Sequence, residues 1–171
     1  MQRSLPLAVL LTLLVATGSA WAAEVHLATT LRSFEEVPAV SSNAGGTFTA
    51  TLSEDRTTIE YELSYTLSGH VTQAHIHIGQ KSVNGGIMIF LCSNLGNGPA
   101  GTQACPDSPA TIHGTIHASD VVSSAGATAQ GVAPGEFFEA QRAILRGVAY
   151  ANVHSDLFPG GEIRGQIQVV P

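Results

Sequence analysis

The stretch Gln73-Ala74-His75-Ile76-His77-Ile78-Gly79 alternates polar and apolar side chains with a period of two. Successive side chains of a β-strand point to opposite faces, so this period predicts a strand with His75 and His77 on one face and the isoleucines on the other. The two histidine Cα atoms would lie roughly 6.5–7 Å apart, which allows both imidazoles to bind one metal ion. A surface-exposed or hydrogen-bonded histidine pair is the alternative for so short a motif.

The same period recurs on both sides of this stretch and predicts an all-β chain. Alternation is clearest over residues 59–67, and the continuously apolar residues 87–92 are typical of a central strand covered on both faces. The predicted strands span residues 24–32, 47–52, 59–67, 71–79, 87–92, 111–118, 148–154 and 162–170. One short helix is expected over residues 136–146, where apolar residues recur at helical spacing. About eight strands joined by short turns predict an antiparallel sandwich or barrel.

The first 22 residues have the composition of a secretory signal peptide. A positively charged start is followed by a short apolar run over residues 5–16 and by the small-residue pattern Ala20-x-Ala22. The apolar run is too short to span a bilayer. We therefore expect a mature chain of residues 23–171 that forms a single domain, is secreted or periplasmic, and is not inserted in the membrane after cleavage.

The charge of the mature chain excludes some classes of partner. Removal of the leader takes away one of the seven basic residues and none of the thirteen acidic ones, which leaves a formal net charge of −7. Nucleic acids and anionic membrane surfaces require basic patches, so neither is expected as a partner. An acidic chain is compatible with binding cations.

The chain has two cysteines, Cys92 and Cys105, and both follow the predicted leader. In an oxidising compartment such a pair is expected to form a disulfide, which would staple the turn-rich loop between them and contribute roughly 3 kcal/mol. Thiolate metal ligation or redox chemistry is the alternative, but there is no Cys-x-x-Cys motif.

Polar side chains also share one face in each of the last two predicted strands. Asn152 and His154 alternate with apolar residues, and Glu162 and Arg164 do so in the following strand. If these strands lie beside residues 71–79, His154 would join His75 and His77 as a third metal ligand, with Asn152, Glu162 and Arg164 around it. For Glu162 and Arg164 an ion pair, or an arginine clamp on backbone carbonyls, is the alternative, and an arginine beside the histidines disfavours a cation.

The remaining histidines do not extend this group. His113 and His117 are four residues apart on one predicted strand, hence roughly 13 Å apart, and cannot share one ion. His26 and His70 are expected to be ordinary surface residues.

Several blocks of the chain resemble the CHRD (chordin-type) domain family between Leu31 and Ile167. The blocks are Glu36-Val37-Pro38 with Gly46-Thr47, Ala74-His75-Ile76-His77-Ile78-Gly79, Gly86-Ile87-Met88-Ile89-Phe90-Leu91, Tyr150-Ala151-Asn152-Val153-His154-Ser155 and Pro159-Gly160-Gly161-Glu162-Ile163-Arg164-Gly165-Gln166-Ile167. The resemblance implies an extracellular or periplasmic immunoglobulin-like β-sandwich of Greek-key type. It places the family histidines at His75, His77 and His154 and implies little about activity.

Three functions of different class remain open from the sequence. The first is a metal-binding module that holds copper or zinc through His75, His77 and His154. The second is an extracellular protein-interaction module in which the histidines are structural. The third is a metalloenzyme similar to the copper/zinc superoxide dismutases, which also carry a His-x-His strand. Because no histidine lies between Gly79 and Ile112 to bridge two metals, and no catalytic triad can be assembled, an enzyme is not expected.

Overall fold

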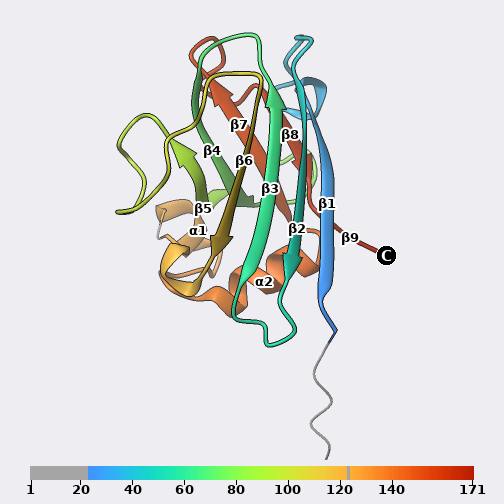
Figure 1. The fold of residues 1–171 in the computed structure, drawn as a ribbon, viewed down its shortest axis with the longest axis vertical. Coiled ribbons are helices and arrows are strands. Elements are labelled where there is room, and N and C mark those ends of the chain that lie inside the picture. The colour runs from blue at the N-terminus through green and yellow to red at the C-terminus, as the bar shows by residue number, and fades with distance from the viewer. Residues whose placement is uncertain (1–22, 123) are drawn as a thin grey trace, which may run out of the picture.

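The alternating segments of the chain form strands in the computed structural model, which describes residues 23–122 and 124–171 (Figure 1). The predicted signal peptide, residues 1–22, lies outside the described residues. The strands are β1 (Val25–Arg32), β2 (Gly45–Leu52), β3 (Ile59–Thr66), β4 (Val71–Ile78), β5 (Gly86–Ser93), β6 (Ala110–Ile116), β7 (Ala149–Ser155), β8 (Ile163–Gln166) and β9 (Gln168–Val170). The helical elements are η1 (Ser33–Glu35), η2 (Ala118–Asp120), α1 (Ala125–Ala129) and α2 (Phe137–Leu145).

The strands pair antiparallel in one sheet with the order β5-β4-β7-β8-β1-β2-β3-β6, and β9 also pairs with β1. The sheet folds back on itself into a nearly closed, barrel-like shape, so that β6, β3, β2 and β1 lie in front of β5, β4 and β7 (Figure 1). The predicted all-β antiparallel class is thus confirmed. The immunoglobulin-like sandwich is not confirmed, since one hydrogen-bonded path links all the strands.

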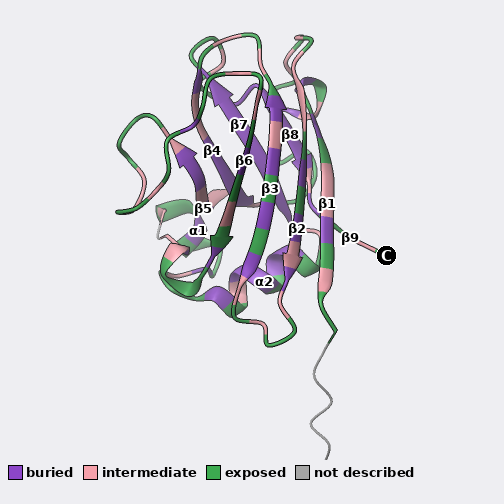
Figure 2. Cartoon of the chain, viewed as in Figure 1, coloured by how far each residue is buried: buried purple, intermediate pink, exposed green. Residues whose placement is uncertain are grey.

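Alternate side chains of the front strands fill the interior. In β3, Leu63 is fully buried and its neighbour Glu62 is exposed, and in β2 Phe48 is buried between exposed threonines. Figure 2 shows β3 with alternating buried and exposed segments. This is the pattern of strands with one face in the core and one in water. β7, by contrast, is buried along its whole length, on both faces.

Two loops cover the outer face of β4, β7 and β8. Asn84, in the loop between β4 and β5, donates a hydrogen bond to the carbonyl of Val37 in the loop after η1. Glu36 accepts a hydrogen bond from Asn152 of β7, and Arg164 of β8 donates one to the carbonyl of Val83. Polar side chains on this face are therefore buried, although they point away from the apolar core.

The structure corrects three details of the sequence analysis. Residues 87–92 lie in β5, which stands at the end of the strand order and not at its centre; β5 is apolar because residues around Val121 and α1 cover it. Residues 162–170 form two strands instead of one, because β9 leaves β8 to pair with β1. Besides the expected helix, which is α2, the chain forms α1, which has Ser124 as its N-cap.

The predicted disulfide between Cys92 and Cys105 is present, with Cα atoms 5.1 Å apart. It ties the loop after β5 back to the end of that strand. Across the described parts of the chain, no helix is both long and apolar enough to cross a membrane.

Candidate metal centre

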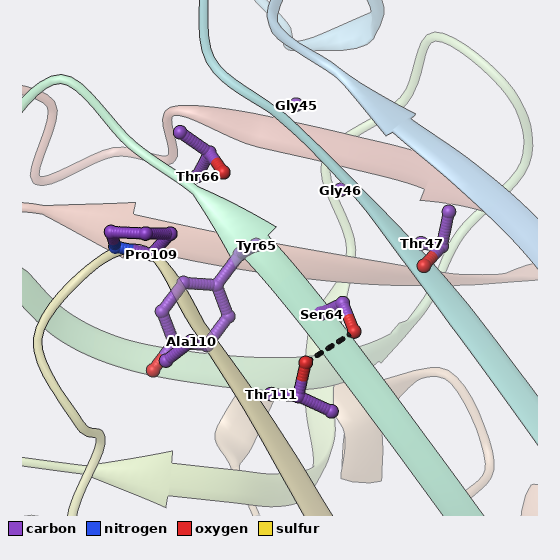
Figure 3. Close-up of a pocket in the computed structure, with 9 residues that line it drawn as sticks. All are labelled: Gly45, Gly46, Thr47, Ser64, Tyr65, Thr66, Pro109, Ala110 and Thr111. Carbon is purple, nitrogen blue, oxygen red and sulfur yellow. Dashed lines mark hydrogen bonds between the residues drawn. The ribbon is translucent and has the colours of Figure 1, made fainter.

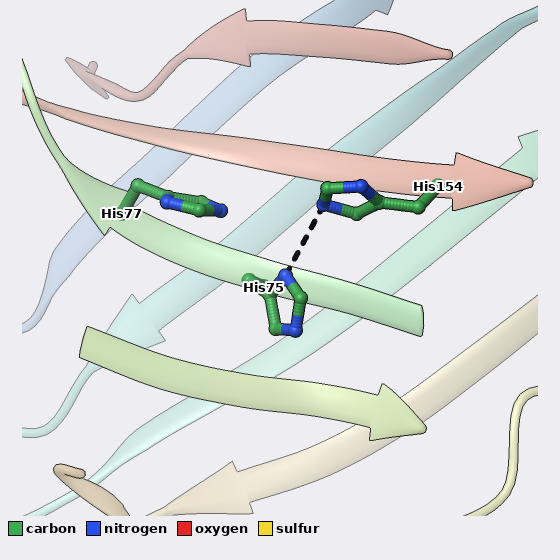
Figure 4. A group of neighbouring side chains, drawn as sticks. All are labelled: His75, His77 and His154. Carbon is green, nitrogen blue, oxygen red and sulfur yellow. Dashed lines mark hydrogen bonds between the residues drawn. The ribbon is translucent and has the colours of Figure 1, made fainter. Parts of the chain in front are cut away.

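Strand pairing brings three histidines from distant parts of the chain to one place. β4 and β7 are antiparallel neighbours, with His77 opposite Tyr150, His75 opposite Asn152, and Gln73 opposite His154. His154 therefore lies diagonally across from His75, on the same face of the sheet. Figure 4 shows the rings of His75, His77 and His154 turned toward one another, and a potential ligand nitrogen from each lies within 4.8 Å of the others.

Backbone carbonyls decide which nitrogen of two of these rings is free. Nδ1 of His77 lies 3.0 Å from the carbonyl oxygen of Gly85, and Nδ1 of His154 lies 2.9 Å from that of Pro159. A carbonyl can only accept a hydrogen bond, so Nδ1 is the protonated nitrogen in both neutral rings. Their Nε2 atoms consequently carry the free lone pairs that a metal ion needs.

His75 completes the group through a hydrogen bond to His154. Its Nδ1 lies 3.3 Å from Nε2 of His154, and because that Nε2 carries no proton, His75 is the donor (Figure 4). Nε2 of His75 is then unprotonated too. This Nε2 is buried and has no hydrogen-bond partner, and the same is true of Nε2 of His77.

Burial keeps all three imidazoles neutral. His75 is 0 % exposed, and His77 and His154 are each 7 % exposed. Burial, reinforced by the neighbouring histidines, lowers the pKa of His75 to about 2, and burial lowers the pKa of His77 to about 4. Burial also lowers the pKa of His154, although its hydrogen bond to the carbonyl of Pro159 acts to raise it. Neutral imidazole is the form that binds metal.

The group fits one ion after a small rearrangement. Three nitrogens bound at about 2.0–2.1 Å to a tetrahedral ion lie about 3.4 Å apart, so a separation of up to 4.8 Å must shrink by up to about 1.4 Å. Rotation of the side chains can supply this. His75 must also release His154, either by moving its proton to Nε2 or by turning its ring. The residues present therefore fit copper or zinc as a three-nitrogen site.

Aromatic rings hold the histidines from two sides. The Tyr150 ring stacks on His77, with centroids 4.7 Å apart and planes within 2°, and its hydroxyl accepts a hydrogen bond from the backbone N–H of Gly85. The rings of Phe90 and His75 contact each other edge to face, with centroids 4.4 Å apart. Tyr150 thus contacts both His77 and the glycine whose carbonyl selects the free nitrogen of His77.

Of the three residues expected around the ligands, Arg164 has the clearest contacts. Its guanidinium lies over the Tyr150 ring, 3.6 Å from the centroid, and donates hydrogen bonds to Asn84 and to the carbonyl of Val83. Among the ion pairs of the described chain there is none between Arg164 and Glu162. Of the two alternatives, the arginine clamp on a backbone carbonyl is the one observed.

Asn152 and Glu162 contact other partners. Asn152 donates hydrogen bonds to Glu36, 2.5 Å away, and to the carbonyl of Ile163. One oxygen of the buried Glu162 accepts the backbone N–H of Ser68, and the other has no partner. Neither residue belongs to the group of potential ligands.

Glu36 is a buried carboxyl that the sequence analysis did not single out as a site residue. Burial raises its pKa to about 7, although the Arg164 charge and hydrogen bonds from Val37 and Asn152 oppose the rise. Its place in the block Glu36-Val37-Pro38 was visible, but its burial depends on the loop that carries it over β7. The sequence does not indicate Gly85 and Pro159 either, because they act through backbone carbonyls that any residue possesses.

The other four histidines are exposed and lie apart from the group. His26 contacts Thr51, His70 lies 3.7 Å from Asp107, and His113 lies 3.6 Å from Glu62. The backbone N–H of His117, the residue before η2, donates a hydrogen bond to the carboxylate of Asp120, the last residue of η2. The expectation that His26 and His70 are surface residues is thus confirmed.

A shallow pocket on the outer face of the front strands has different chemistry. It is lined by residues of β2, β3 and the start of β6, where the hydroxyls of Ser64 and Thr111 are hydrogen-bonded at 2.7 Å (Figure 3). Its lining contains no histidine, carboxylate or thiolate. This pocket therefore offers no metal ligands of the kind present at the three histidines.

Comparison with known proteins agrees with the sequence blocks described above. The CHRD domain family matches the chain over residues 27–167, a span that contains all three histidines and both cysteines. No curated protein and no solved structure matches the chain. With nearly all of the described residues inside the match, the chain belongs to the CHRD domain family.

Proposed function

We propose that this protein is an exported metal-binding module that holds one copper or zinc ion through His75, His77 and His154. The observation that carries the proposal is the buried Nε2 atom of His77, which points into the group and has no hydrogen-bond partner. A buried acceptor left unpaired costs about 1–3 kcal/mol. A metal ion in the centre of the group would bind one such lone pair directly and favour the neutral rings that burial already enforces.

The same observation counts against purely structural histidines. If the three rings served only to hold strands together, each buried nitrogen would be expected to have a partner, as most buried polar atoms do. His77 and His154 use Nδ1 in this way, and their Nε2 atoms point inward to the group. The alternative function, an extracellular protein-interaction module, does not require this convergence.

The proposal extends to compartment and fold type. The disulfide suits an oxidising compartment, which supports secretion or a periplasmic location. Only one residue pair, Arg32 with Arg164, joins β8 to β1. This weak link supports the proposal that the two halves of the sheet are the layers of an immunoglobulin-like sandwich. No catalytic role is proposed, and the acidic mature chain is proposed to bind neither nucleic acid nor membrane.

Isothermal titration calorimetry of the exported protein with copper and with zinc tests the function. We expect one ion per chain, and we expect His77→Ala and His154→Ala each to lose most of the affinity. His26→Ala removes an exposed histidine outside the group and should bind like the wild type. Equal affinity in the wild type and in the double variant His77→Ala/His154→Ala would refute the proposal and leave the interaction module as the better reading.

A further inference from the structure

The candidate metal centre offers an ion three protein ligands. Within the described part of the chain, the group of potential ligands consists of His75, His77 and His154, without a carboxylate or a thiolate. Both cysteines are bound in the disulfide, and the buried carboxyls of Glu36 and Glu162 stand outside the group. An ion at this place would therefore be coordinated by three neutral nitrogens.

The burial of these nitrogens limits which ions can be satisfied. Zinc is almost always four-coordinate, and where the protein supplies three ligands a water takes the fourth position. Divalent copper prefers a square-planar or tetragonal set of at least four ligands. A buried water needs space and two to four polar partners of its own. The Nε2 atom of His77, which points into the group, is out of contact with solvent, so the centre favours an ion that is stable with three ligands.

Charge acts in the same direction. Burying a divalent ion among neutral ligands costs more than burying a monovalent one, because the desolvation energy grows with the square of the charge. The buried Arg164 adds to this cost, since its guanidinium carbon lies 3.6 Å from the Tyr150 ring, which stacks 4.7 Å from His77. At roughly 10 Å and an effective dielectric constant of about 20, one extra positive charge on the ion reduces its affinity about tenfold. Glu36 offsets this only in part, because its raised pKa leaves it about half protonated near neutral pH.

We propose that the centre binds copper as the monovalent ion, Cu(I), in preference to Zn(II) and Cu(II). Cu(I) is stable with three ligands and carries one charge less than either competitor. This inference rests on the proposed function and names the ion that the same three histidines select.

The test compares the three ions on the exported protein. Cu(I) affinity is measured without oxygen by competition with bicinchoninate, Zn(II) affinity by competition with a chromophoric chelator, and Cu(II) affinity by calorimetry. We expect one Cu(I) per chain and affinities for Zn(II) and Cu(II) that are at least about 100-fold weaker, from the combined loss of a fourth ligand and the extra charge. His77→Ala should lose Cu(I) binding, and His26→Ala should keep it.

Two matched variants of Arg164 test the effect of its positive charge on ion preference. Arg164→Gln removes the positive charge and should raise the ratio of Zn(II) to Cu(I) affinity about tenfold. Arg164→Lys retains the charge and should leave the ratio near that of the wild type. Because both affinities are measured on the same variant, a general loosening of the site affects both and largely cancels in the ratio. An unchanged ratio in Arg164→Gln would refute the role of this charge.

Other outcomes separate the inference from the proposed function. Zn(II) or Cu(II) bound at least as tightly as Cu(I), and lost in His77→Ala, would overturn the preference for Cu(I) and leave the metal-binding function standing. Binding of none of the three ions would overturn both. Cu(I) bound equally well by the double variant His77→Ala/His154→Ala would place it elsewhere on the chain and would also overturn both.

Discussion

Acidification should destabilise the metal-free protein, because its buried histidines resist protonation. In the folded chain burial lowers the pKa of His77 to about 4 and that of His75 to about 2, from an ordinary value of 6.5. Below pH 6.5 the unfolded chain therefore binds more protons than the folded one, and the free energy of unfolding falls with pH. The stability contributed by the neutral rings is present above pH 6.5 and is lost as the pH falls toward the folded-state values.

The expected loss follows from these values. Between pH 7 and pH 5, His75 and His77 each remove about 2 kcal/mol from the free energy of unfolding, and His154 acts in the same direction. Glu36 acts in the opposite direction, because burial raises its pKa from 4.5 to about 7. Its contribution is fully present below pH 4.5 and is lost as the pH rises through 7, so acidification to pH 5 restores about 2 kcal/mol. The histidines outweigh the carboxyl, which leaves a net loss of about 2 kcal/mol.

Urea denaturation of the protein, with a chelator present, measures this loss at pH 7, 6 and 5. Glu36→Gln keeps a side-chain oxygen for Asn152 but cannot titrate, so its loss over the same interval should rise to about 4 kcal/mol. Against a total stability of about 5–15 kcal/mol, both changes are large enough to resolve. A free energy of unfolding that stays constant or increases between pH 7 and pH 5 in both proteins would show that the three histidines are not buried as neutral rings.

Two further predictions concern residues that support the site. Tyr150→Phe keeps the ring on His77 but removes the acceptor for the Gly85 N–H, so metal affinity measured by calorimetry should fall about five- to tenfold. Tyr65→Phe is the control and should not change the metal affinity, because Tyr65 lines the separate pocket of Figure 3. Gly161→Ala should lower the free energy of unfolding by about 1–3 kcal/mol in urea, because Gly161 has φ +127° and its added Cβ would meet Asn152 and Glu36 at 2.7 Å. The control is Gly160→Ala, whose Cβ meets no atom within 4 Å, and equal stability of the two alanine variants would contradict the argument.

Much of this architecture is readable from local patterns. The period-two alternation of Ile59, Tyr61 and Leu63 places β3 within one residue of its observed bounds, and the buried side of that strand follows from the same residues. The cysteine pair, in a chain that its sequence predicts to be exported, predicts the observed disulfide. These features are local or follow from composition, because the direction of a strand side chain depends on its own position in the alternation and the state of a cysteine on its compartment.

The candidate site depends on contacts that no local pattern contains. Polar faces mark His75 and His154 as candidates, but only the pairing of β4 with β7 brings them together across 79 positions of sequence. The same pairing places β7 inside the sheet, while β5, whose apolar run predicted a central strand, lies at the end of the order. The choice of Nε2 in His77 depends on the carbonyl of Gly85, and the raised pKa of Glu36 depends on a loop laid over β7. Alternation determines which face a side chain occupies, but strand order and loop packing determine what it meets there, because those energies come from residues far apart in the chain.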